Sequence, residues 1–123
     1  MKENAFVKEI MRQLDERKNK LELVQFRGCS AYVGYEASTM TWTDDEIGCE
    51  HEIRIIPIVS YDTVVGFADV DNEVVYEYGK YTATTSKQFT QICNKRFQRY
   101  DRVLVDVSTA DRFTKKDWGW RNR

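Results

Sequence analysis

The sequence predicts a single α+β domain, residues 1–123, in which a mainly antiparallel sheet of about five to six strands carries two helices on one face. Three observations predict it. Two segments repeat apolar residues at helical spacing, several short runs rich in Val, Ile, Phe and Tyr read as strands, and short turns join consecutive strands. A chain of this length buries roughly two-thirds of its unfolded surface, enough for one core without a disulfide or a metal.

The first helix is expected over residues 5–18. Phe6, Ile10 and Leu14 are spaced i, i+4 and i+8, and charged residues occupy the other face. This apolar stripe predicts a helix packed on a sheet.

The second helix is expected over residues 85–98. Thr85 followed three residues later by Gln88 fits a capping box at its start. Phe89, Ile92 and Phe97 then form one apolar face, which we expect to be buried.

Six segments have strand character. Pro57 lies inside the most apolar of them, and because proline donates no backbone hydrogen bond, we expect a bulge or an edge there. Residues 69–72 have good turn chemistry, so the two flanking segments should form a hairpin. The six segments are 21–26, 31–35, 53–59, 63–68, 73–78 and 102–107.

Residues 36–52 differ from the rest because they contain six acidic residues and no Lys or Arg. Trp42 is interspersed among the acids. We interpret the segment as a long acidic loop or hairpin, and loops of this length in compact domains are often functional.

The charge of the chain is divided between its two parts. Residues 1–79 carry 8 Lys and Arg against 16 Asp and Glu, whereas residues 80–123 carry 11 against 4. Such asymmetry predicts either a charged partner or electrostatic pairing within the fold.

The basic part ends in a tail, residues 108–123, in which cations are interleaved with aromatic residues. This composition fits phosphate contacts with base stacking, and it equally fits a protein-binding surface rich in Trp and Arg. A third reading is that the tail packs on the body and neutralises the acidic part.

One stretch resembles a known group of proteins. The sequence from Ser60 to Val65, and then from Tyr78 to Gln88, has a Tyr-x-Thr-x-Val strand and a Lys-Tyr-x-x-Thr-Thr-Ser-Lys helix start. This is similar to small proteins of bacteriophages and mobile elements that have no established activity. The resemblance covers residues 60–97 and implies an accessory protein made in a bacterial cytoplasm.

The sequence contains no strong catalytic or metal-binding motif. It lacks a glycine-rich phosphate loop, a Gly-x-Ser-x-Gly elbow and a His-Glu-x-x-His pair. Cys49 and His51 are two residues apart, but a structural zinc site needs four ligands. We therefore expect no enzyme and no cofactor. The three cysteines are expected to be free thiols, and no segment reads as a signal peptide or a membrane span.

Two functions follow as hypotheses. In the first, the protein binds a host protein, as anti-defence proteins such as CRISPR inhibitors do, with its acidic segment mimicking nucleic acid. In the second, the basic third binds nucleic acid, although the near-zero net charge counts against this. The candidate partner-binding residues are Trp42, Asp44, Asp45, Glu46, Glu50, Arg99, Arg112, Lys115, Lys116, Trp118 and Trp120.

Overall fold

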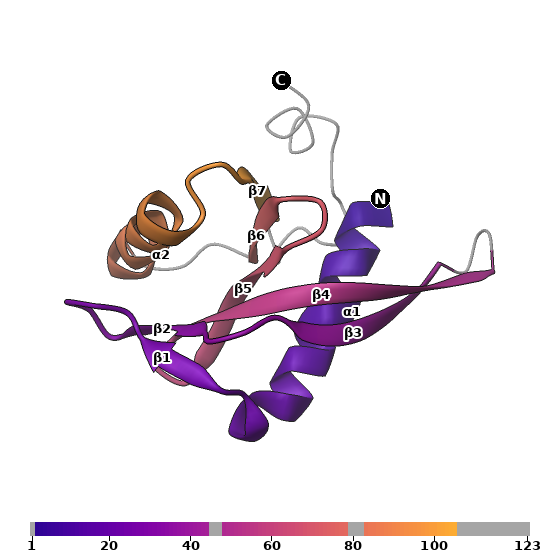
Figure 1. Cartoon of the computed structure of the whole chain (residues 1–123), viewed down its shortest axis with the longest axis horizontal. Coiled ribbons are helices and arrows are strands. Elements are labelled where there is room, and N and C mark those ends of the chain that lie inside the picture. Colours follow the sequence, from indigo (N-terminus) through magenta and orange to yellow (C-terminus); the bar gives the residue numbers. More distant parts are fainter. Residues whose placement is uncertain (1, 45–47, 79–82, 106–123) are drawn as a thin grey trace.

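The computed structural model describes the backbone of residues 2–44, 48–78 and 83–105. Two α-helices, α1 (Lys2–Arg17) and α2 (Ala83–Arg96), flank a sheet, and a 3-10 turn (Lys18–Lys20) follows α1. The strands are β1 (Leu23–Gln25), β2 (Ala31–Gly34), β3 (Ser38–Asp44), β4 (Cys49–Ser60), β5 (Thr63–Asp69), β6 (Val74–Tyr78) and β7 (Asp101–Val105). In the described part they form one sheet of order β1-β2-β4-β5-β6-β7, with β3 also paired to β4 (Figure 1).

The predicted class is confirmed, because the fold is α+β with a mainly antiparallel sheet. Among the pairings described, β6 with β7 is parallel and the others are antiparallel. The parallel pair requires a crossover, and α2 supplies it. The hairpin expected around residues 69–72 is present as β5 and β6.

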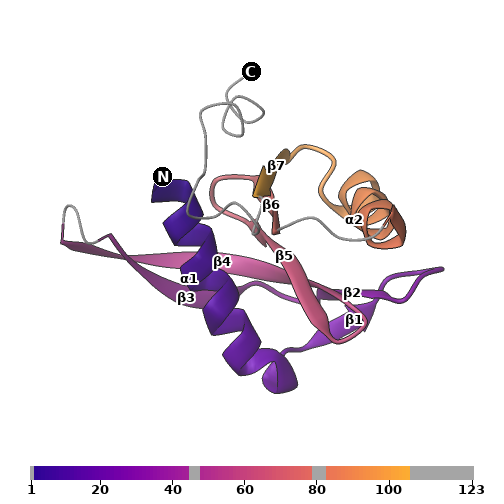
Figure 2. The same ribbon diagram turned by 180° about the vertical axis from the view of Figure 1, so that it is seen from behind.

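The placement of both helices on one face was wrong, because they cover opposite faces of the sheet. Neighbouring strand residues alternate between two separate core clusters: Val74 and Tyr76 pack with α1, whereas Val75 packs with α2. Helix α1 passes behind β3 and β4 in Figure 1 and in front of them in Figure 2. An apolar stripe shows that a helix packs on a sheet, but not on which face.

The apolar faces of both helices are confirmed. Ile10, Leu14, Phe89, Ile92 and Phe97 are at most 3% exposed, and Phe6 is partly buried against the α1 cluster. The capping box does not form as expected. The side chain of Gln88 is buried, and its Oε1 accepts a hydrogen bond from Ser60 Oγ at 2.7 Å.

Segment 36–52, expected as a loop or a hairpin, contains β3 and the start of β4, so the sheet has seven strands in the described residues. Strands β2 and β3 follow one another along the same edge of β4: β2 pairs with it up to Ile58 and β3 up to Ile55. Pro57 lies opposite the break between them, in agreement with the irregular pairing expected there. A Cβ on Gly34 would lie 2.6 Å from Pro57 Cδ, so this close approach requires glycine.

Candidate functional site

The most prominent surface feature is a two-stranded arm formed by residues 39–44 of β3 and 49–54 of β4. Strand β5 pairs with β4 only from Ile55 onward, so the arm extends beyond the rest of the sheet. Both views show this hairpin projecting from the body (Figures 1 and 2).

The two faces of the arm differ because side chains alternate along each strand. On the face toward α1, Met40 is buried and Trp42 and Ile53 are partly buried against the α1 cluster. Trp42 pairs directly with His51, so the histidine belongs to the same face. We call the opposite face the acidic face; it carries Thr39, Thr41, Thr43, Glu50, Glu52 and Arg54.

The negative charge of the acidic face is left without a cation along most of its length. Glu50 and Glu52 are exposed and form no ion pair with any described residue. Arg54, at the base of the arm, instead pairs with Asp71 at 2.6 Å. Their mutual hydrogen bond raises the pKa of Arg54 and lowers that of Asp71.

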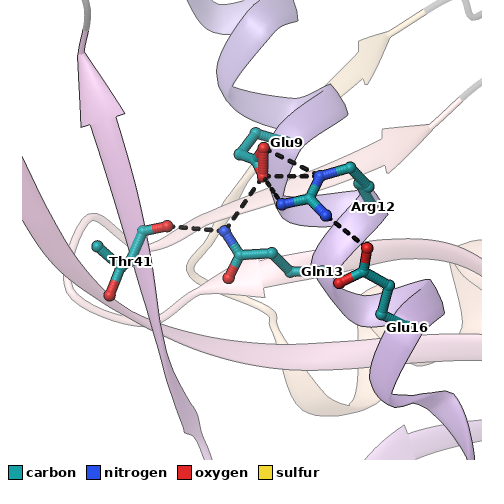
Figure 3. Close-up of polar contacts among 5 residues, drawn as sticks. All are labelled: Glu9, Arg12, Gln13, Glu16 and Thr41. Carbon is teal, nitrogen blue, oxygen red and sulfur yellow. Dashed lines mark hydrogen bonds and ion pairs between the residues drawn. The ribbon is translucent and has the colours of Figure 1, made fainter.

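The base of the arm is held against α1 by a polar contact. Gln13 Nε2 donates a hydrogen bond to the backbone oxygen of Thr41 at 2.8 Å (Figure 3). On the same helix face Arg12 binds Glu9, and this hydrogen bond lowers the pKa of the Glu9 carboxyl. The Gln13–Thr41 hydrogen bond and the contact of Trp42 with Phe6, at 5.6 Å between ring centroids, hold this part of β3 against α1.

Two arginines at and after the end of α2 form contacts within the fold. Arg96 donates to the backbone oxygens of Gly34 and Tyr35 at 2.9 and 3.3 Å. Arg102 forms an ion pair with buried Glu77 at 2.7 Å and also donates to Thr90 Oγ1 at 2.9 Å. Of the cations in the basic part, Arg102 is therefore paired beneath α2, and Arg96, although exposed, is bound to backbone oxygens; Arg99 is exposed.

Several predicted site residues lie outside the described residues. Asp45 and Glu46 lie between β3 and β4 in the sequence and are not described. Asp44 is the last residue of β3, and its side chain is not described. The candidates of the basic tail are also outside the described range: Arg112, Lys115, Lys116, Trp118 and Trp120.

The cysteines and the histidine do not gather into a reactive group in the described part of the chain. No set of three or more His, Cys, Asp or Glu side chains there could hold a metal ion. Cys49 is exposed on the arm, whereas Cys93 is buried on the inner face of α2. Burial raises the pKa of the Cys93 thiol to about 11, so this thiol stays protonated and unreactive at neutral pH.

Sequence reasoning missed the acidic face because it treated segment 36–52 by composition. The signal was present: Thr39, Thr41 and Thr43 alternate with Met40 and Trp42, which is the period of a strand with one apolar face.

Neither described helix is long and apolar enough to cross a membrane. Comparisons of the chain with protein-family models, with curated proteins and with solved structures found no match.

Proposed function

We propose that this is a non-catalytic accessory protein of a phage or mobile element that binds a host protein in the bacterial cytoplasm. The acidic face of the arm binds a basic surface of that partner, in the place that nucleic acid would take there, as an anti-defence inhibitor would. The observation that carries the proposal is that Glu50 and Glu52 are exposed on a projecting arm and have no cation partner among the described residues.

The shape and charge of the arm support this role. A two-stranded ribbon is narrow enough to enter a groove, and its extended strands place Glu50 and Glu52 side by side on one face, roughly 6–7 Å apart along the strand. Thr43 and Thr41, which pair with Glu50 and Glu52 on the neighbouring strand, add hydroxyl groups beside these carboxylates. A basic groove shaped for a phosphate chain offers cations to such a row of acids.

The test is capture of a host protein by immobilised wild-type protein, followed by a direct affinity measurement. The variant Glu50→Gln, Glu52→Gln should lose at least about tenfold in affinity, because each exposed charge contributes to encounter and to binding. The control Glu22→Gln, Asp62→Asn changes the net charge equally at exposed positions away from the arm. It should bind as the wild type does.

Two further measurements test whether the arm mimics nucleic acid. Duplex DNA or RNA should compete with the arm for the captured partner. Added salt should weaken the complex, since the screening length falls from about 10 Å at 0.1 M to about 3 Å at 1 M. Equal binding by the arm variant and the control would refute the proposal, and failure of nucleic acid to compete would refute the mimicry.

A further inference from the structure

A hollow of about 300 Å³ lies at the base of the arm, on the face that α1 covers. Its walls come from three places in the sequence: Phe6 of α1, Trp42 and His51 of the arm, and residues 69–76 around the β5–β6 turn. The volume is at the small end of the range for ligand pockets, so it suits one side chain better than a whole metabolite.

The inner wall of the hollow is aromatic. Phe6 stands nearly perpendicular to Trp42 and to Tyr76, with ring centroids 5.6 and 5.5 Å away. Phe6 also contacts the fully buried ring of Phe67 at 5.8 Å, which anchors the wall in the core. Aromatic faces in a partly enclosed site attract cations through the ring quadrupole.

Asp69 and Asp71 are among the lining residues of the hollow, and Asp71 is already paired with Arg54 at 2.6 Å. Asp69 is the informative one because it is only 3% exposed. It accepts hydrogen bonds from the backbone N–H and the side-chain amide of Asn72 at 3.3 and 2.8 Å, but it has no cation partner among the described residues. Buried carboxylates are normally paired with a cation, so this charge is incompletely compensated.

We infer that this hollow receives a lysine or arginine side chain of the protein that the arm binds, an inference that rests on the proposed function. The aromatic wall and the carboxylate of Asp69 together suit an ammonium or guanidinium group with an aliphatic stem. A metal ion fits less well, because the acidic groups described here do not converge into a metal-binding set.

The experiment uses the isolated full chain and needs no partner. Acetyl-arginine methylamide and acetyl-lysine methylamide are titrated into ¹⁵N-labelled protein at constant ionic strength, with uncharged acetyl-norleucine methylamide as the control. The two cationic probes should produce saturable shifts at the Trp42 indole and at the amides of His51 and Asn72, and the norleucine probe should not.

Matched variants locate the site. Asp69→Asn should weaken binding of the arginine probe at least about threefold, because it removes the buried charge but keeps an acceptor oxygen. Trp42→Leu should do the same by removing the aromatic wall, and it serves if Asp69→Asn fails to fold. Asp62→Asn removes an exposed charge away from the arm and the hollow and should bind the probe as the wild type does.

The outcomes separate this inference from the proposed function. No saturable shift, or equal shifts with the norleucine probe, overturns the cation pocket, even if partner capture still requires Glu50 and Glu52. Equal weakening by Asp62→Asn and Asp69→Asn also overturns it, since the effect would then be general electrostatics. If the cationic probes bind saturably but partner capture does not depend on Glu50 and Glu52, the proposed function is overturned and the cation-binding pocket remains.

Discussion

The arm and the β6–α2–β7 unit handle charge in opposite ways. In the β6–α2–β7 unit, Arg102 bonds to Glu77 and Thr90 beneath α2 and lies over the ring of Phe89, 5.1 Å from its centroid. On the arm, Glu50 and Glu52 are exposed and have no cation partner in the part of the chain that the structure describes. The same residue types therefore stabilise the fold in one region and remain available for a partner in the other. Net charge alone does not distinguish these two uses.

The largest effect on stability is expected in the β6–α2–β7 unit, where the charges are paired. Arg102→Leu should lower the free energy of unfolding by about 2–4 kcal/mol, because Glu77 would be left buried without its cation. Urea denaturation at neutral pH measures this. The double variant Arg102→Leu, Glu77→Leu should recover part of the loss, whereas equal losses in the single and double variants would show that the packing of Arg102, and not its charge, matters.

An intermediate effect on stability is expected from Cys93, which lies in the β6–α2–β7 unit. Its counterpart on the arm is Cys49. The folded chain holds the pKa of the Cys93 thiol at about 11, against an ordinary value of 9.0. The neutral Cys93 thiol contributes fully to the free energy of unfolding below pH 9. As the pH rises toward 11, this contribution falls by about 1–2 kcal/mol. Unfolding measurements from pH 8 to pH 11 should therefore fall more steeply for the wild type than for Cys93→Ala.

Labelling with a thiol reagent at neutral pH compares the reactivity of the two cysteines directly. Exposed Cys49 on the arm should react without unfolding, and Cys93 should react only when the chain unfolds. Rapid modification of Cys93 in the native protein would contradict its burial on the inner face of α2.

The smallest effect on stability is expected on the arm. Glu50→Gln together with Glu52→Gln should change the free energy of unfolding by less than about 0.5 kcal/mol, since both side chains are exposed and unpaired in the described structure. A slight gain would fit the removal of repulsion between them. A loss as large as that of Arg102→Leu would show that the acidic face is structural and would remove the contrast between the two regions.

The sequence was informative where a pattern is local. The stripe of Ile10 and Leu14 predicted α1, and the turn after Asp69 predicted the β5–β6 hairpin, because a few neighbouring residues determine each. The face that each helix covers was not predictable in this way. It depends on which strand residues meet the helix, and these lie far along the chain.

The candidate site was predicted only in part. The acidic segment was identified as distinctive, but its strand pairing places Glu50 and Trp42 on opposite faces, a division that composition does not show. The pairing of Arg102 with Glu77 joins residues that meet only after α2 has crossed from β6 to β7. Counting cations along the sequence therefore overestimated how many are available for nucleic acid.

The parallel placement of β7 beside β6 has a consequence for how the protein is made. Val103 and Val105 of β7 belong to the same buried cluster as Val7 and Ile10 of α1, so an early and a late part of the chain complete one core. During synthesis, α1 emerges long before the strand that finishes its packing surface. We therefore expect cooperative folding only after β7 has left the ribosome, and contacts between residues so distant in sequence should make this step slow for a domain of this size.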